Sequence, residues 1–93
     1  MKLLSTHLDA GKFGTIEFRM TKSDAQKGYH PGNCDEDVAA IRKKPYIKEQ
    51  ISKLTDEVME EVLIECGIEY DQNDRNEIVD CFLWVVAGDI FDR

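Results

Sequence analysis

The residues of this chain that combine reactive side chains with close spacing are His30 and Cys34. A thiol and an imidazole near each other are typical of a nucleophile with its base, or of two metal ligands. No second Cys-x-x-Cys or histidine pair completes a zinc site, and the carboxylates at 35–37 disfavour the thiolate form of Cys34. We therefore expect a structural loop here. A small ligand-binding protein or enzyme that uses Tyr29, His30 and Cys34 stays open as an alternative.

A second candidate is the acidic segment at residues 71–76, which superficially resembles a calcium-binding loop. An EF-hand needs an oxygen ligand at its fifth position, glycine at its sixth and glutamate at its twelfth, where this chain has Arg75, Asn76 and Phe82. Helix capping explains the segment better. The sequence also contains no glycine-rich phosphate loop, no Gly-x-Ser-x-Gly elbow and no His-Glu-x-x-His motif. We therefore expect no enzyme activity, no bound metal and no cofactor.

The elements that would position these residues begin with a β-hairpin over residues 1–22. Ile16, Phe18 and Met20 alternate with polar residues, which predicts a strand with one apolar face. A weaker strand over residues 2–8 precedes it, and two glycines between the strands permit a hairpin loop.

The rest of the chain is predicted to be mainly helical, after a loop over residues 23–33 that holds one short helical turn. That turn begins with the capping box Ser23–Gln26 and ends at Gly28. Charge order, caps and apolar spacing then indicate four helices. Their expected ranges are 34–44, 46–54, 55–66 and 74–91.

The last predicted helix, residues 74–91, is apolar on nearly all sides. Such a helix is usually buried, so we expect it at the centre of the domain. Asp80 and Asp89 interrupt its apolar surface, and each requires a compensating neighbour. The sequence thus predicts one α+β domain over residues 1–93, in which the N-terminal hairpin packs on a four-helix part at residues 34–93.

Charge is distributed unevenly along the chain. The formal net charge is −7, from 12 Lys and Arg residues against 19 Asp and Glu residues. Residues 1–54 carry a net charge of +3, whereas residues 55–93 carry −10. An acidic chain is poorly suited to bind nucleic acid nonspecifically or to dock on an anionic membrane.

The acidic half of the chain has two interpretations, a merely solvated exterior or a surface that attracts a basic partner protein. In its strongest form, such a surface imitates the phosphates of a nucleic acid and occupies a nucleic-acid-binding cleft. The residues that we predict to bind a partner are Glu57, Glu60, Glu61, Glu65 and Glu69.

The cysteine count and the apolar runs predict a cytoplasmic protein. Three cysteines, an odd number without short-range pairing, indicate reduced thiols. The N-terminus lacks the apolar stretch of a signal peptide, and the longest near-apolar run, residues 81–88, is far too short for a membrane span.

Several short sequence words resemble those of a group of small uncharacterised bacterial and phage-associated proteins. They are Cys34–Ile41, Pro45–Ile47 and Asn76–Ile90, the last of which ends in Leu-Trp-Val-Val-Ala-Gly-Asp-Ile. The resemblance covers residues 28–93, and the Tyr70-Asp71 junction departs from the pattern of the group. Because the group has no established activity, the resemblance implies a phage or mobile-element origin and nothing more specific.

Together these features predict a non-enzymatic acidic protein-binding module. Small acidic proteins of phage origin often bind and block a host protein, so we expect a phage-encoded inhibitor of a host nucleic-acid-handling or defence complex, of the CRISPR or restriction type. One alternative is a homo-oligomer that shares the surplus apolar face of residues 74–91. The other alternative is the ligand-binding protein or enzyme built around His30 and Cys34.

Overall fold

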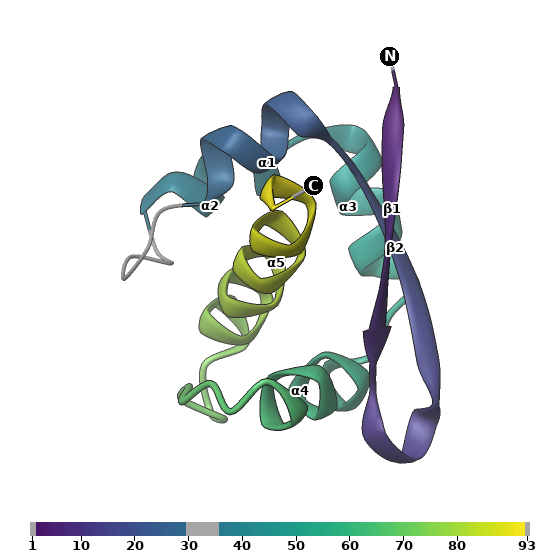
Figure 1. Ribbon diagram of the computed structural model, residues 1–93. Coiled ribbons are helices and arrows are strands. Elements are labelled where there is room, and N and C mark those ends of the chain that lie inside the picture. The colour runs from purple at the N-terminus through teal and green to yellow at the C-terminus, as the bar shows by residue number, and fades with distance from the viewer. Residues whose placement is uncertain (1, 30–35, 93) are drawn as a thin grey trace.

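The predicted β-hairpin is present in the computed structural model, which describes residues 2–29 and 36–92 (Figure 1). Its two strands, β1 (Leu3–Asp9) and β2 (Thr15–Thr21), pair in antiparallel fashion along their whole length. A short 3₁₀-helix, η1 (Gly11–Phe13), forms the connection between them. The alternating pattern and the two glycines therefore predicted this element correctly.

One face of the hairpin is buried against the helices. Phe18 and Met20 of β2 are fully buried, whereas Arg19 between them and Glu17 before them are exposed. Thr6 of β1 lies opposite Phe18 in the register and is also fully buried. Because side chains alternate between the faces of a strand, this register places one polar hydroxyl inside an otherwise apolar face.

Five α-helices follow the hairpin in the described part of the chain. Their bounds are α1 (Lys22–Gly28), α2 (Glu36–Arg42), α3 (Pro45–Ser52), α4 (Asp56–Glu65) and α5 (Arg75–Phe91). The last four correspond to the four predicted helices, of which residues 34 and 35 lie outside the described residues. The predicted α+β class is confirmed.

Helix α1 is longer than the single turn that we predicted. It begins after Thr21, whose hydroxyl oxygen accepts a hydrogen bond from the backbone N–H of Asp24 at 3.1 Å, and not at the capping box Ser23–Gln26. Gly28 is its last helical residue. A Cβ there would lie 2.6 Å from Cδ1 of Ile41, so glycine at this position permits close packing of α1 on α2.

Helix α5 is the central element, as predicted. It contacts α1, α2, α4 and both strands (Figure 1). Phe82 in its middle packs edge to face on Phe18 of the hairpin, with ring centroids 5.4 Å apart. The core therefore forms where the other elements pack around α5.

Among residues 2–29 and 36–92, none of the helices has the length and apolar character that a membrane span requires.

The two acidic residues that interrupt α5 have the compensating neighbours that we predicted. Asp80 accepts a hydrogen bond from Nη1 of Arg42 at 2.7 Å. Asp89 accepts one from the hydroxyl of Thr6. In addition, Nζ of Lys22 donates to two backbone carbonyl oxygens in the last turn of α5, at 2.7 and 3.1 Å. A cation at this end offsets the negative end of the helix dipole.

Candidate functional site

The glutamates that we predicted to bind a partner lie on α4 and in the connection after it. Glu57, Glu65 and Glu69 are exposed, and Glu60 and Glu61 are half-buried. On a helix, residues three or four positions apart lie on one face, so the four glutamates of α4 gather on the side away from the core. We call Glu57, Glu60, Glu61, Glu65 and their neighbour Ile64 the acidic face.

A hollow of about 250 Å³ brings three of these glutamates together, Glu57, Glu60 and Glu61. Glu65 and Glu69 lie outside it, and Glu69 belongs to a separate shallow hollow in the connection between α4 and α5. The other side chains of the first hollow are Lys12, Ile64, Tyr70 and Gln72. The structure therefore unites part of the predicted set and separates Glu69 from it.

The acidic face continues onto the hairpin loop. A Cβ built on Gly11 would lie 2.5 Å from Oε2 of Glu61 and 3.5 Å from Oε1 of Glu65. Gly11 also has a φ of 57°, in the left-handed region that favours glycine. Two carboxylates of α4 therefore lie directly against η1, where a larger residue would have to push them away.

Two exposed apolar side chains accompany the carboxylates. Ile64 on α4 is 58% exposed and lines the same hollow as Glu57 and Glu60. Phe13 on η1 is 43% exposed, and Nζ of Lys12 lies 5.4 Å from the centre of its ring. Since α4 contacts η1, these side chains belong to one continuous region of the surface. The region is thus both acidic and apolar.

Tyr70 is a member of this region that the sequence did not reveal. Partial burial raises the pKa of the Tyr70 hydroxyl above its usual value, and the charges of Glu60 and Glu61 and a hydrogen bond to Glu60 raise it further. The Tyr70 hydroxyl therefore stays protonated near neutral pH, beside the carboxylates of Glu60 and Glu61. The only local signal was an aromatic residue in a turn just after an acidic helix.

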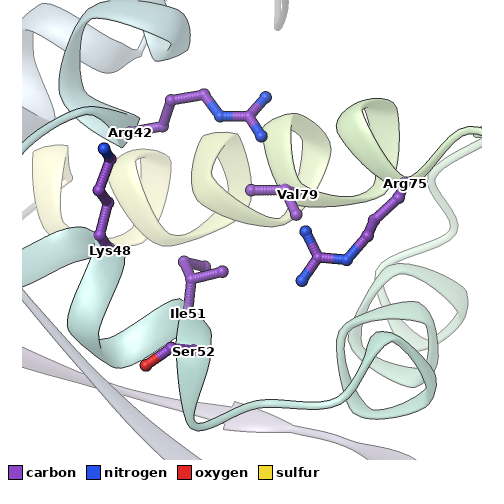
Figure 2. A pocket seen from close by; sticks show the side chains of 6 residues that line it. All are labelled: Arg42, Lys48, Ile51, Ser52, Arg75 and Val79. Atoms are coloured by element: carbon purple, nitrogen blue, oxygen red, sulfur yellow. The ribbon is translucent and has the colours of Figure 1, made fainter.

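A second hollow, of about 270 Å³, lies between α2, α3 and α5 and has a cationic lining (Figure 2). Arg42, Lys48 and Arg75 come from three different helices, and the apolar side chains of Ile51 and Val79 lie between them. Ser52 completes the lining. No spacing in the sequence marks this site, because the three cations are brought together only by the packing of the helices.

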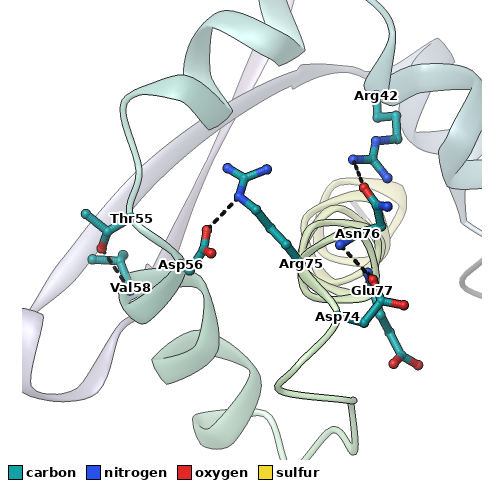
Figure 3. Close-up of polar contacts among 8 residues, drawn as sticks. All are labelled: Arg42, Thr55, Asp56, Val58, Asp74, Arg75, Asn76 and Glu77. Carbon is teal, nitrogen blue, oxygen red and sulfur yellow. Dashed lines mark hydrogen bonds and ion pairs between the residues drawn. The ribbon is translucent and has the colours of Figure 1, made fainter.

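The starts of α4 and α5, near this hollow, are fixed by capping side chains (Figure 3). The hydroxyl oxygen of Thr55 accepts from the backbone N–H of Val58 at 3.2 Å. Oδ1 of Asp74 accepts from the backbone N–H groups of Asn76 and Glu77, at 3.0 and 3.3 Å. The acidic segment before α5 therefore caps the helix, which is the interpretation that we preferred over a calcium loop.

A buried carboxylate forms a third polar cluster, which no motif in the sequence marks. Asp24 on α1 is 2% exposed, accepts from Nζ of Lys44 at 2.7 Å and accepts from the hydroxyl of Tyr46. The same Tyr46 hydroxyl oxygen accepts from the backbone N–H of Thr21 at 3.2 Å. The Tyr46 hydroxyl, at the start of α3, therefore contacts both the end of β2 and the helix α1.

The protonation states of this cluster favour a structural role. Burial alone would raise the pKa of the Asp24 carboxyl, but hydrogen bonds from Lys44, Tyr46 and Thr21 outweigh it and hold the pKa below its usual value. The hydrogen bond to Asp24 raises the pKa of Lys44, and burial together with that carboxylate raises the pKa of Tyr46. Asp24 therefore stays ionised, and Lys44 and Tyr46 stay protonated, near neutral pH. Groups that do not change protonation state in this range are poorly suited to proton transfer.

Of the loop that we considered for ligand binding or catalysis, Tyr29 alone is described. Its ring packs on Trp84 and Phe91 of α5, with centroids 5.3 and 5.2 Å apart. His30 and Cys34 lie outside the described residues. The ring of Tyr29 therefore packs at the edge of the core. The chemistry considered for His30 and Cys34 stays a prediction.

The other two cysteines, Cys66 and Cys81, form no disulfide bond with each other in the described part of the chain. Burial raises the pKa of the Cys66 thiol, and the negative charges of Glu65, Asp89 and Asp9 raise it further. Cys66 is therefore a weak nucleophile at neutral pH even though its residue is exposed.

Within the part of the chain that the structure describes, no group of three or more His, Cys, Asp or Glu side chains is arranged to hold a metal ion. Comparisons with family models, curated proteins and solved structures give no match to this chain. The resemblance to small phage-associated proteins stays a prediction.

Proposed function

We propose that this chain is a non-enzymatic protein-binding module that recognises a basic protein surface through its acidic face. The observation that carries this proposal is Ile64, which is 58% exposed beside Glu57 and Glu60. Exposed apolar side chains rimmed by charges are typical of interaction sites. The glutamates supply long-range attraction and Ile64 supplies an apolar anchor at the centre.

The spacing of the glutamates favours a particular class of partner. Glu57, Glu61 and Glu65 follow one another at four-residue intervals, which corresponds to a rise of roughly 6 Å on a helix. A regular row of negative charges resembles the backbone of a nucleic acid. The proposed partner is therefore a nucleic-acid-handling or defence protein with a basic cleft, and the proposed role is that of a phage-encoded inhibitor that occupies the cleft.

The site of action that we propose is the cytoplasm. The odd number of cysteines, three in the whole chain, is typical of proteins that keep their thiols reduced, and Cys66 and Cys81 form no disulfide bond with each other. Partners with basic nucleic-acid-binding clefts are found in the same compartment in bacteria.

The experiment is capture of partners from a bacterial lysate by the immobilised chain, followed by mass spectrometry. It is run at about 0.1 M and about 1 M salt, where the screening length falls from about 10 Å to about 3 Å. The test variant carries Glu57→Gln and Glu60→Gln. The matched control carries Glu17→Gln and Glu49→Gln, which remove the same charge from β2 and α3.

The expected result is a basic protein that the unaltered chain and the control capture at low salt, and that high salt or the test variant removes. The proposal fails if no captured protein depends on Glu57 and Glu60. It also fails if the two double variants lose the same partner to the same extent, because net charge would then explain the binding.

A further inference from the structure

We propose that the cationic hollow between α2, α3 and α5 binds the carboxylate of a small organic acid. The hollow is separate from the acidic face. Its proposed ligand is an anion, whereas the proposed partner of the acidic face is positively charged. Arg42 ends α2, Lys48 belongs to α3 and Arg75 begins α5. In sequence, Arg75 is the single Lys or Arg within residues 55–92, and the fold places it with two cations from the basic half.

The two arginines are held in place by the protein and still offer donors to a ligand (Figure 3). Arg42 donates from Nη1 to Asp80 at 2.7 Å and from Nη2 to Asn76 at 3.2 Å. Arg75 donates from Nε to Oδ1 of Asp56 at 3.0 Å. This contact leaves the two terminal nitrogens of the Arg75 guanidinium for an anion, and such a planar fork suits a carboxylate.

The charge of the lining indicates an anion with a single negative charge. Arg42 and Arg75 are each paired with one carboxylate of the protein. Lys48 has no ion pair with another described residue, so within the described part of the chain its positive charge is available to a ligand. A carboxylate balances this charge, whereas a phosphate dianion would leave an excess of negative charge.

The floor of the hollow indicates a ligand with an apolar body. Ile51 and Val79 are 9% and 2% exposed and lie between Lys48 on one side and Arg75 on the other (Figure 2). An apolar group placed on them gains from leaving water, while its carboxylate reaches the cations at the rim. The volume of about 270 Å³ restricts this body to a short chain or a single ring.

The test is a titration of the whole protein at pH 7, followed by the NMR signals of the Ile51 and Val79 methyl groups. The probes are hexanoate, its neutral counterpart hexanamide, and inorganic phosphate. We expect hexanoate to shift both residues in a saturable way and hexanamide to bind at least about tenfold more weakly. The methyl groups of Leu8, which is buried in the hairpin, should not move.

Variants separate recognition by the cations from simple insertion into an apolar hollow. Lys48→Gln should weaken hexanoate binding by about tenfold, and Lys48→Arg should retain it. Lys53→Gln, directly after the end of α3, is the control, since Lys53 pairs with Glu49 and does not line the hollow. Both positions are exposed, so the fold should persist in all three variants, which the methyl spectrum itself reports.

The proposal is overturned if hexanoate and hexanamide give equal affinities, because the hollow would then bind apolar groups without recognising a carboxylate. It is also overturned if phosphate shifts these methyl groups and hexanoate does not, or if no probe shifts them. If the Lys48→Gln and Lys53→Gln variants bound hexanoate with equal affinity, Lys48 would have no part in binding, which would also overturn the proposal.

Discussion

Thr6, in the middle of the first strand, donates the hydrogen of its buried hydroxyl to the carboxylate of Asp89, near the end of the last helix. The two residues are 83 positions apart in sequence. The contact joins the hairpin to α5 and gives Asp89 a partner at the end of the helix where the dipole disfavours a negative charge.

Replacement of Thr6 by Val should therefore destabilise the fold. Valine fills the same volume without the hydroxyl, so the change removes a hydrogen bond to a charged group, worth about 1.5 kcal/mol. Urea denaturation measures the loss. Thr15→Val at an exposed position of β2 is the matched control and should change the free energy of unfolding by less than about 0.5 kcal/mol. Equal effects of the two variants would contradict the structural role of the Thr6 hydroxyl.

The buried Asp24 carboxylate should make stability depend on acid pH. Its pKa is lowered in the folded protein, so the unfolded chain takes up the proton first as the pH falls below about 4. The stabilisation is therefore complete at neutral pH and disappears as the pH falls through the lowered pKa. We expect Asp24→Asn to cost about 2 kcal/mol at pH 7, and the difference from the unaltered protein to shrink toward pH 3. A difference that is constant across this range would contradict the lowered pKa.

The same cluster should also weaken at alkaline pH, because the pKa values of its two other groups are raised, whereas the pKa of Asp24 is lowered. The pKa values of Lys44 and Tyr46 are raised, so their contribution is complete below about 10 and is lost as the pH rises through the raised values. Denaturation curves at neutral and alkaline pH measure this loss. Tyr46→Phe should be less stable at pH 7, and the contribution of Tyr46 to the alkaline loss should disappear.

Gly88 on α5 should not tolerate alanine, although alanine favours a helix by about 1 kcal/mol over glycine. A Cβ there would lie 2.8 Å from Cε1 of Tyr29, whose ring packs on Trp84. We expect Gly88→Ala to displace the ring and to destabilise the protein by about 1–2 kcal/mol. Trp84 is the single tryptophan of the chain, so its fluorescence reports the displacement directly. Higher stability with unchanged fluorescence would refute this close packing.

Ile64 should matter for binding and not for folding. Because it is 58% exposed, Ile64→Ser should change the free energy of unfolding by less than about 0.5 kcal/mol. Loss of an apolar anchor at an interface should weaken capture of the partner by about tenfold. Ile68→Ser, outside the hollow of the acidic face, is a comparison that should keep binding. If the Ile64 variant captured the partner as well as the unaltered chain does, Ile64 would not be part of the interface.

Self-association is the alternative use of α5 that the sequence suggested. Its apolar side chains pack within the single chain, with Phe82, Leu83, Val86 and Ile90 fully buried. Burial in the chain's own core is sufficient to explain their apolar character. We therefore expect a monomer of 10.7 kDa in sedimentation at micromolar concentration, and a larger species would favour the homo-oligomer.

The sequence predicted those features that depend on neighbouring residues. The alternation around Phe18 marked a strand, and the side chains of Thr55 and Asp74 marked the starts of two helices. Thr21 was missed as the cap of α1 because Ser23 offered a competing signal two positions later. Caps and alternation are local, so they leave a trace in sequence.

The polar clusters could not be predicted in the same way. Asp24 meets Lys44 and Tyr46 only after α1 and α3 have packed, and no spacing in the sequence marks the contact. Arg75 similarly appeared as a lone cation in an acidic segment. Of the acidic face, the glutamates were evident from composition, while the exposure of Ile64 depends on which side of α4 the core covers.

The central position of α5 bears on how the protein acquires its structure during translation. The ribosome releases the hairpin first and α5 last among these elements, since synthesis proceeds from the N-terminus. Phe18 and Thr6 have no partners on α5 until that helix emerges. The hairpin and the early helices therefore cannot complete their core packing until α5 has been made, and folding of the domain is completed only after that point.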